Sequence, residues 1–303
     1  STTRPPPSTT RPAKRAGAHH AARGPPNHQS EENEPMTDKI QLDKRYDEQV
    51  AVITLNRPEK HNAFDGDILD GYIAALDEVR DDDGIQVVLT KANGPSFASG
   101  MDLHYLRDFR ASYRPLYDWG RMKTPARISV ALLDYPKVTV AAVHGYCLGG
   151  GFSLMMAHDV VVIADDAQIG MPEVLRGSFG QGVTAQIIKE GIPRKKAVLL
   201  QLLGRNLTGA EAERLGLATL SVPPEDVQAE AHKIAVELGT RNPSVLAHAK
   251  IAMNLDENLP RVHAMWSDDM VAARMRMSVD PLGDVDGYLK SQKGGTNKNY
   301  VRS

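Results

Sequence analysis

The chain has 303 residues, 41% of them hydrophobic and 24% charged, with a formal net charge of -2 at pH 7 and one cysteine, Cys147. This length allows one large domain, or a core with a smaller helical part. The charge excludes a global basic field for nucleic acid or anionic lipid, the single cysteine excludes an intramolecular disulfide framework, and no apolar stretch is long enough to cross a bilayer. We therefore expect a soluble, cytoplasmic protein.

The first 35 residues differ from the rest of the chain. They are rich in Pro, Thr, Arg and His and contain almost no large apolar side chain. Such a segment buries too little apolar surface to offset the entropy lost on ordering, so we expect it to be disordered. We predict three parts: a disordered N-terminal segment over 1–35, a core over 36–223 and a C-terminal helical part over 224–303.

Strand patterns in the core are short apolar runs, many of them rich in β-branched residues. They predict strands over 40–55, 85–90, 137–143, 159–164 and 167–170. The polar and aromatic residues 105–117 fit neither pattern, and we interpret them as a mobile loop or lid.

Helical patterns alternate with these strands and then continue alone to the end of the chain. They predict helices over 67–80, 124–133, 183–188, 195–203, 209–215, 227–238, 245–253 and 262–277. Asp65 or Asp67 is expected to cap the first of these helices. The order of the elements predicts an α/β core with an α-helical appendage.

Several common catalytic motifs are absent from the sequence. There is no Gly-x-x-x-x-Gly-Lys-Ser/Thr phosphate loop, and the glycines at 149–151 and 177–182 do not have the dinucleotide spacing Gly-x-Gly-x-x-Gly. His-Glu-x-x-His and the hydrolase motif Gly-x-Ser-x-Gly are also missing. Nucleotide hydrolysis, hydride transfer, zinc chemistry and serine hydrolysis are therefore poor interpretations.

The glycine-rich stretch at 144–153 is the most informative local motif. An apolar strand pattern leads into Gly149-Gly150-Gly151, and residues compatible with a helix follow. Residues without a Cβ permit close approach, and the first turn of a helix leaves amide N–H groups unpaired at the positive end of its dipole. Two interpretations remain open at this point: a site that stabilises an oxyanion, or a junction whose glycines only permit tight packing.

Two further features could belong to the same site. Gly100-Met101 is a second glycine-bearing strand exit, which is expected to lead into a helix after Leu103, so the two exits could each supply one backbone N–H to a single oxygen. Glu173 follows Pro172 at the end of a predicted strand, where its carboxylate could act as a general acid and base. The alternative for Glu173 is an ordinary surface acid at a helix start.

Together these residues resemble the crotonase (enoyl-CoA hydratase/isomerase) superfamily over residues 40–290. Four segments match its signatures in order and spacing: 56–63, 97–103, the triple-glycine turn ending in Asp159, and 170–173. The resemblance implies an α/β fold of the crotonase-like ββα superhelix type, with a C-terminal α-helical part that trimerises. It implies a homo-oligomer, either a trimer or a dimer of trimers.

The resemblance also implies the roles of the central residues. The N–H groups of Met101 and Gly150 would hold the thioester oxygen of an acyl-CoA as an enolate-like charge forms on it. Glu173 matches one of the family's two catalytic glutamates, whereas Ser153 takes the place of the other. A neutral serine can orient a water or a substrate hydroxyl but cannot act as a base at ordinary pH, which leaves Glu173 as the sole strong acid and base.

Ser153, the preceding Phe152 and the Gly-Met-Asp-Leu segment look most like the hydroxycinnamoyl-CoA hydratase-lyases. Enzymes of that group add water to an aryl-enoyl-CoA and then cleave the β-hydroxy adduct into an aromatic aldehyde and acetyl-CoA. Their substrate-binding tyrosine in the C-terminal helix is not matched around 266–270. Tyr105, Tyr113 or Tyr117 could replace it, or could have a packing or lid role.

Binding of coenzyme A (CoA) is assigned by the same resemblance to Lys60 and Ala63 in the loop after the first strand, with Ser99 as a further candidate. For Lys60 the alternative is a solvated loop lysine. The triplet Arg194-Lys195-Lys196 suggests RNA, the 3′-phosphate of CoA or a solvated helix start. We expect no cofactor beyond CoA as part of the substrate thioester, no metal, no membrane partner and no nucleic acid.

The sequence thus predicts a hydratase or lyase acting on an α,β-unsaturated acyl-CoA, with an aromatic acyl group as one candidate. A one-glutamate enoyl-CoA isomerase and an acyl-CoA hydrolase or decarboxylase are the enzymatic alternatives. A CoA-binding or RNA-binding scaffold is the non-enzymatic one.

Overall fold

The computed structural model describes residues 38–112, 125–180, 182–189, 192–277 and 289–290. The described residues all belong to one unit, Pro35–Ser303. The segment expected to be disordered, 1–35, therefore lies outside the described residues, as do Tyr113 and Tyr117.

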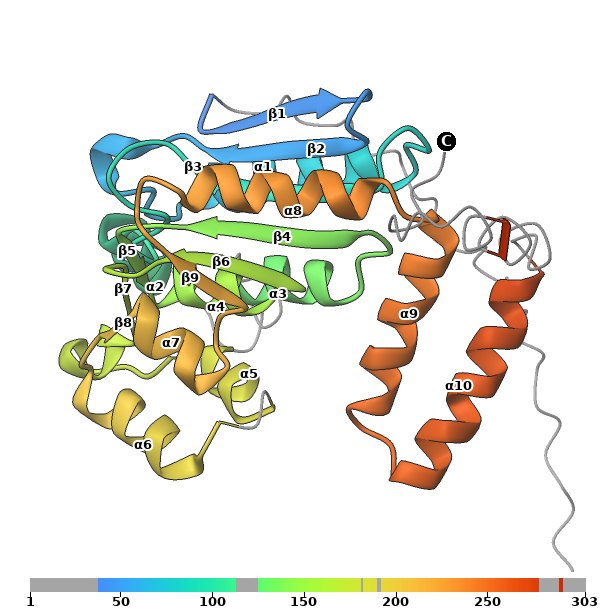
Figure 1. Cartoon of the computed structure of the whole chain (residues 1–303). Coiled ribbons are helices and arrows are strands. Elements are labelled where there is room, and N and C mark those ends of the chain that lie inside the picture. Colours follow the sequence, from blue (N-terminus) through green and yellow to red (C-terminus); the bar gives the residue numbers. More distant parts are fainter. Residues whose placement is uncertain (1–37, 113–124, 181, 190–191, 278–288, 291–303) are drawn as a thin grey trace, which may run out of the picture. The chain divides into compact units, whose positions relative to one another are not determined.

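The main sheet of this unit is almost entirely parallel (Figure 1). Its first pair is an antiparallel hairpin, so the strand pattern at 40–55 is two strands joined by a turn. The strands Val50–Leu55, Val87–Ala92 and Val138–Val143 are buried on both faces, as expected for parallel strands made of continuous apolar runs. In spatial order the strands are β1 (Ile40–Arg45), β2 (Val50–Leu55), β3 (Val87–Ala92), β4 (Val138–Val143), β6 (Val160–Ala164) and β9 (Leu220–Val222).

A second, smaller sheet includes part of the glycine-rich stretch 144–153. It consists of β5 (Tyr146–Leu148), β7 (Gln168–Gly170) and β8 (Leu207–Thr208). The predicted path from strand directly to glycine turn is therefore wrong, because β5 intervenes after β4 and pairs with β7 instead of extending the main sheet. This pairing places the end of β5, and the glycines after it, beside the end of β7.

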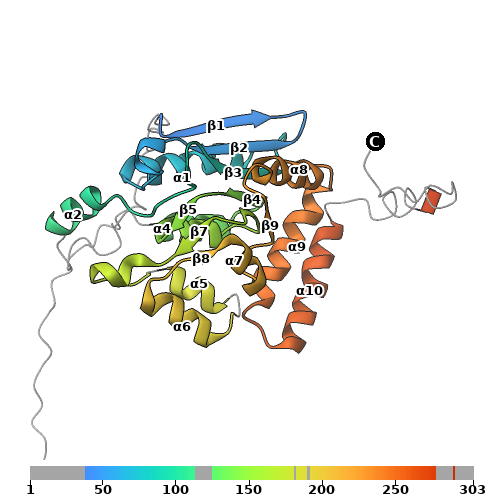
Figure 2. The ribbon, with the colours of Figure 1, turned by 60° about the vertical axis from the view of Figure 1, so that its left-hand side comes forward.

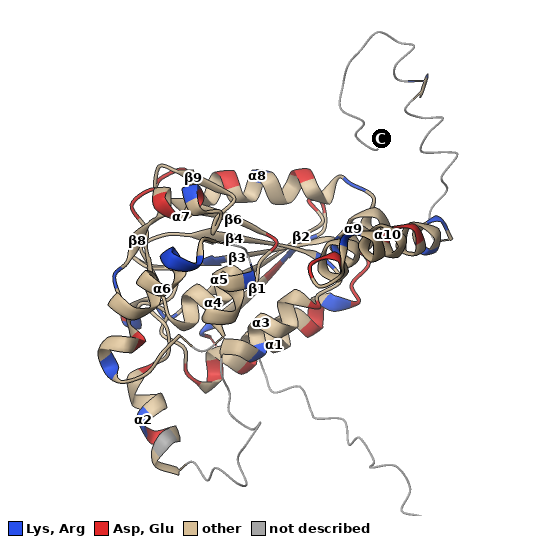
Figure 3. Ribbon diagram, turned by 90° about the horizontal axis from the view of Figure 1, so that it is seen from below, with Lys and Arg blue, Asp and Glu red and all other residues tan. Residues whose placement is uncertain are grey.

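Helices cover both faces of the main sheet, with α8 (Val227–Gly239) on one face and α1 (Gly66–Arg80) and α3 (Pro125–Leu133) on the other (Figure 3). Helix α8 packs against β3, β4 and β6 through side chains spaced four residues apart. The part predicted over 224–303 thus begins with a helix that completes the core layer.

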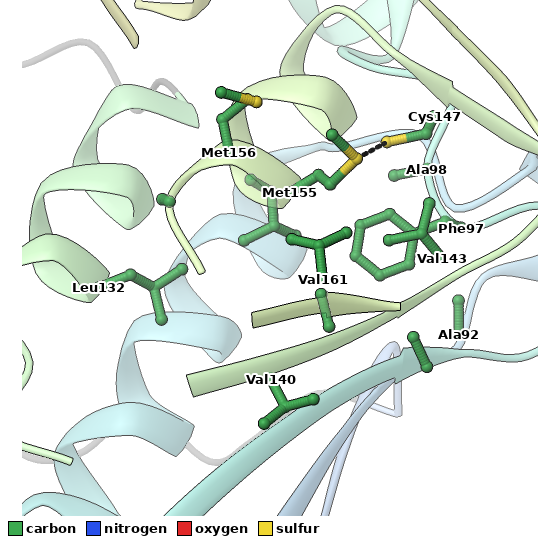
Figure 4. Packing of buried hydrophobic residues seen from close by; sticks show 14 of the residues in the cluster. Ala92, Phe97, Ala98, Leu132, Val140, Val143, Cys147, Met155, Met156 and Val161 are labelled. Atoms are coloured by element: carbon green, nitrogen blue, oxygen red, sulfur yellow. Dashed lines mark hydrogen bonds between the residues drawn. The ribbon is translucent and has the colours of Figure 1, made fainter. Parts of the chain in front are cut away.

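The core between these layers is a single apolar cluster that reaches the glycine motif (Figure 4). Phe97, Cys147 and Met155 meet in it, and the Cys147 Sγ lies 3.8 Å from the Met155 Sδ. Burial raises the pKa of the Cys147 thiol, which keeps it protonated and inert. Cys147 is therefore a packing residue.

The last two described helices, α9 (Pro243–Asp256) and α10 (Arg261–Arg276), form a hairpin beside the core (Figures 1 and 2). Lys250 on α9 is buried, and its ammonium group donates a hydrogen bond of 2.7 Å to Asp159 at the start of β6. Among the helices that the structure describes, none is long and apolar enough to span a membrane.

Seven further helices lie within the described residues. They are the 3₁₀ helices η1 (Pro58–Lys60) and η2 (Pro172–Arg176), and the α-helices α2 (Leu103–Ser112), α4 (Gly150–Met156), α5 (Val183–Lys189), α6 (Arg194–Leu203) and α7 (Gly209–Leu215). The interpretation of 105–117 as a loop is wrong for its described part, because residues 105–112 belong to α2.

Candidate active site

The loop at Gly100-Met101 is held in place by backbone hydrogen bonds on both sides of the Met101 amide. The Phe64 N–H donates to the Gly100 carbonyl at 2.7 Å, and the Asp102 N–H donates to the Phe64 carbonyl at 2.8 Å. The Met101 N–H itself makes no hydrogen bond to any residue in the described part of the chain. Gly100 has φ +97°, a left-handed backbone that other residues adopt at a cost. A rigid loop therefore presents an unpaired donor.

Asp102 fixes the same loop from its other side. One carboxylate oxygen accepts the His104 N–H at 2.8 Å at the start of α2, and the other pairs with the Arg57 guanidinium at 2.9 Å. Hydrogen bonds from the α2 amides and from Arg57 hold the pKa of Asp102 below its usual range despite partial burial. The Asp102 carboxylate thus links the Met101 segment to α2 and to Arg57 in the loop after β2.

The second candidate donor is the Gly150 N–H at the start of α4. The Gly149 N–H is used, because it donates to the Gly170 carbonyl at 2.9 Å, whereas the Gly150 N–H has no acceptor among the described residues. A methyl group built on Gly100 would come within 3.5 Å of the Gly150 nitrogen and 3.0 Å of the Leu148 carbonyl oxygen. The two strand exits are therefore neighbours, and their free amides border one space.

That space is a cavity of about 570 Å³. It is bordered by both strand exits, by one side of α2, by the start of α3 and by η2. Its lining residues are Ser99, Gly100, Met101, Leu103, Tyr105, Leu106, Arg107, Phe109, Pro125, Ala126, Gly149, Gly150, Pro172, Glu173, Arg176, Ser178 and Phe179. The walls are mainly apolar, with a few polar groups near the amides, which is the usual composition of a small-molecule site.

Glu173 extends into this cavity from η2. Its carboxylate lies so close to Gly149 that any Cβ at position 149 would collide with it. The Glu173 Oε2 is buried and has no hydrogen-bond partner in the described part of the chain. Burial raises the pKa of Glu173, and the nearby Arg176 partly opposes that rise. A buried carboxylate oxygen without a partner is costly, so the place of Oε2 in a cavity with two free amides suggests a chemical role.

Ser153 does not reach the cavity. It is fully buried on α4, and its Oγ lies 3.0 Å from the Ser129 Oγ and donates to the Gln186 Oε1 at 3.2 Å. These contacts tie α4 to α3 and α5. The proposed part of Ser153 in orienting water or substrate stays a prediction, and in this conformation the side chain packs behind the cavity wall.

The residues predicted to bind CoA lie on one loop system at the edge of the site. Only Ser99 lines the cavity, and its Oγ donates to the Lys60 carbonyl at 3.4 Å. The Lys60 side chain is exposed, and Ala63 is buried with its carbonyl accepting from Arg57 at 2.9 Å. The structure thus joins Ser99 to Met101, Gly150 and Glu173, with Lys60 and Ala63 outside the cavity lining.

Several lining residues were not predicted from the sequence, and Arg176 and Phe179 are two of them. Arg176 stands three residues after Glu173, and Phe179 follows it in the same segment. The 3₁₀ helix that brings Arg176 to the cavity has three residues per turn and places positions three apart on one side. The Pro172 start and the Gly177 end were the available signals of such a turn. Tyr105, one of the alternatives to the missing tyrosine, lines the cavity as well.

The fold and the site belong to a known class. A sequence profile described as "Enoyl-CoA hydratase/isomerase" matches residues 45–280, which is most of the chain, so this protein belongs to the enoyl-CoA hydratase/isomerase family. The crystal structure of an enoyl-CoA hydratase from Mycobacterium smegmatis superimposes with a TM-score of 0.77 at 22% identity, covering 84% of this chain and 97% of that one. The predicted crotonase-type α/β fold is therefore confirmed.

Curated relatives in the family are more similar in sequence. A Mycobacterium tuberculosis protein named "Probable enoyl-CoA hydratase echA8" is 34% identical over 214 residues, which cover 69% of this chain and 79% of that protein. The hydroxycinnamoyl-CoA hydratase-lyase of Pseudomonas fluorescens is 30% identical over 202 residues, covering 66% of this chain and 73% of that enzyme. The names of both relatives match the groups that the sequence motifs resemble.

Proposed function

We propose that this protein is an acyl-CoA hydratase or hydratase-lyase that acts on an α,β-unsaturated acyl-CoA through a thioester enolate. The observation that carries the proposal is the buried Oε2 of Glu173, which has no partner among the described residues, in a cavity bordered by the free amides of Met101 and Gly150. Backbone donors aimed at a developing negative charge stabilise it without reorganisation. CoA enters only as part of the substrate thioester.

In the hydration step, the Glu173 carboxylate accepts a proton from water as the water oxygen forms a bond to Cβ. The electron pair of the Cα–Cβ double bond moves to the thioester oxygen, where the amides of Met101 and Gly150 hold the enolate. Glu173 then returns the proton to Cα, which gives the 3-hydroxyacyl-CoA. One carboxylate thus carries the proton from oxygen to carbon, in keeping with the place of Ser153 outside the cavity.

Carbon–carbon cleavage uses the same groups in a second step. Glu173 accepts the proton of the β-hydroxyl, the Cα–Cβ bond breaks, and an aldehyde leaves while the enolate of acetyl-CoA remains on the two amides. Protonation of that enolate at carbon completes the reaction. The resemblance to the hydratase-lyase relative and the aromatic walls at Tyr105, Phe109 and Phe179 support this extension.

Incubation with aliphatic and aromatic 2-enoyl-CoA esters in H₂¹⁸O tests the function. We expect mass spectrometry to find one heavy oxygen in the β-hydroxyl of the product, because water adds to Cβ. An unlabelled product with a shifted double bond would instead show an isomerase, and label in a free carboxylate would show a hydrolase. No turnover of any thioester would favour a CoA-binding scaffold.

We also propose that the protein assembles as a trimer or a dimer of trimers through its helical hairpin. Helix α10 has no buried residue in the described chain, and Val262, Trp266 and Met270, spaced four apart, form an apolar stripe. Trp266 and Met270 have 62% and 72% of their surface exposed. Apolar stripes of this kind mark contact surfaces between proteins.

Trp266→Glu is expected to dissociate the assembly, because a charge in the apolar stripe opposes its burial. Sedimentation velocity or light scattering should show a shift from a trimer multiple to the monomer mass. Leu202→Glu adds the same charge to an exposed apolar position on α6 and serves as the control. A wild-type chain that is monomeric at micromolar concentration contradicts the proposal.

A further inference from the structure

Arg176 is one of two arginines among the described residues of the cavity lining, and the reaction just described uses neither Arg176 nor Arg107. Arg176 is the last residue of η2, one 3₁₀ turn after Glu173, and both side chains line the cavity. Within the described residues its guanidinium makes no ion pair and no hydrogen bond, and Gly177 ends the turn directly after it. A guanidinium offers donors in a planar fork that matches a carboxylate, so a free one at a binding site is suited to such a group.

Among the described residues no carboxylate forms a direct ion pair with the exposed Arg176, although Glu173 lies close enough to interact with it by charge. Arg107, the other arginine among the lining residues, is already paired with Asp108 at 2.8 Å. Glu173 is the only acidic residue among the lining residues that the structure describes. The rest of the wall near α2 is apolar, from Leu103, Leu106 and Phe109. An apolar acyl chain that ends in an anion would complement this apolar wall and the guanidinium of Arg176, which has no ion pair among the described residues.

We propose that Arg176 recognises a carboxylate at the distal end of the acyl group, so that the preferred substrates are monothioesters of unsaturated dicarboxylic acids. This specificity rests on the proposed function. The thioester oxygen would lie at the amides of Met101 and Gly150, the reacting carbons at Glu173, and the far carboxylate at the guanidinium.

The phosphates of CoA are the other anions that could meet Arg176, and the position of Glu173 argues against them. Arg176 is close enough to Glu173 to lower its pKa by charge interaction, and Glu173 must face Cα and Cβ to act. The phosphates are separated from these carbons by the whole pantetheine arm, whereas the end of a short acyl chain lies within a few bonds of them. The acyl carboxylate is therefore the anion that fits.

Binding of saturated thioesters tests this specificity without turnover. We expect calorimetry to show that glutaryl-CoA binds the wild-type protein about 10- to 100-fold more tightly than the analogue whose terminal carboxylate is a carboxamide, since charge-assisted bidentate pairs are strong. Arg176→Gln should remove this preference and leave the affinity for the carboxamide unchanged. Arg176→Lys should restore part of it, because the charge returns without the fork. Arg107→Gln is the matched control and should keep the preference.

Two results would overturn the proposal. Equal affinity of the wild-type protein for the carboxylate and the carboxamide would show that the acyl end is not recognised by charge, whether or not any variant folds. Equal weakening of both thioesters and of free CoA by Arg176→Gln would place the guanidinium on the phosphates. Neither result depends on turnover, so failure of the hydratase activity in H₂¹⁸O remains a separate finding.

Discussion

Glu173→Gln is expected to lower kcat by about 10²–10⁴-fold, the usual contribution of a positioned general acid and base. Glutamine keeps the size of the side chain but can neither accept the proton from water nor deliver it to Cα. The affinity for a saturated acyl-CoA should remain close to that of the wild type, because the amides of Met101 and Gly150 are untouched. Steady-state kinetics and calorimetry on the same preparations measure both quantities.

The pH dependence gives a second readout for Glu173. Burial raises the pKa of this carboxyl, and the base must be ionised, so kcat/KM should rise with pH through a midpoint above the ordinary glutamate range. Arg176→Gln removes a cation that lowers this pKa and should move the midpoint to higher pH. If the midpoint of the rise in kcat/KM lies at the ordinary glutamate pKa, the titrating group is not Glu173.

The same raised pKa has a consequence for stability. A carboxyl that binds its proton more tightly in the folded state contributes most to stability below its unfolded pKa, and the contribution falls as pH rises through the folded pKa. At neutral pH the charged form therefore opposes folding. Glu173→Gln should have an unchanged or higher Tm at pH 7, which separates its loss of activity from unfolding.

Glu225→Gln is the matched control for Glu173→Gln. Glu225 is exposed before α8 and is not one of the lining residues, so its loss should change neither kcat nor Tm. Retention of more than a tenth of wild-type kcat by Glu173→Gln would contradict its assigned role. Another group would then have to carry the proton.

Much of the fold could be predicted from local patterns because its central elements are locally determined. The strands β2, β3 and β4 are buried on both faces. Such strands appear in a sequence as uninterrupted apolar runs, which can be recognised without knowledge of their partners. The expected cap of the first helix is confirmed for Asp65, whose carboxylate accepts the Ile68 N–H at 3.1 Å. These features depend on neighbours in the chain.

What could not be predicted depends on distant partners. Strand β5 has three residues, and only its pairing with β7 makes it a strand. A helix after Leu103 was predicted but its extent was not, because α2 has apolar residues that face the cavity instead of the core and its pattern is not that of a buried helix. The burial of Ser153 follows from Ser129 and Gln186, which are 24 and 33 residues away in the chain. No spacing within the glycine motif contains that information.

Lys250→Met is expected to lower the free energy of unfolding by about 3 kcal/mol, the lower end of the cost of breaking a buried ion pair, because Asp159 retains some exposure. The Lys250 side chain is only 4% exposed and also donates to the Leu132 and Lys137 carbonyls at 3.2 Å each. Methionine keeps the apolar stem and leaves all three acceptors without this donor. Urea denaturation followed by circular dichroism measures the loss.

The effect of Lys250→Met should be concentrated where α9 joins the core, because this ammonium group links the hairpin to the elements around Asp159. Hydrogen exchange should therefore accelerate in α9 more than in β3, and the oligomer should weaken with it. Lys233→Met removes an exposed pair with Glu230 on α8 and should change stability by no more than about 0.5 kcal/mol. If Lys250→Met costs no more than this control, the buried ammonium does not hold the hairpin, and the apolar contacts of α9 must do so alone.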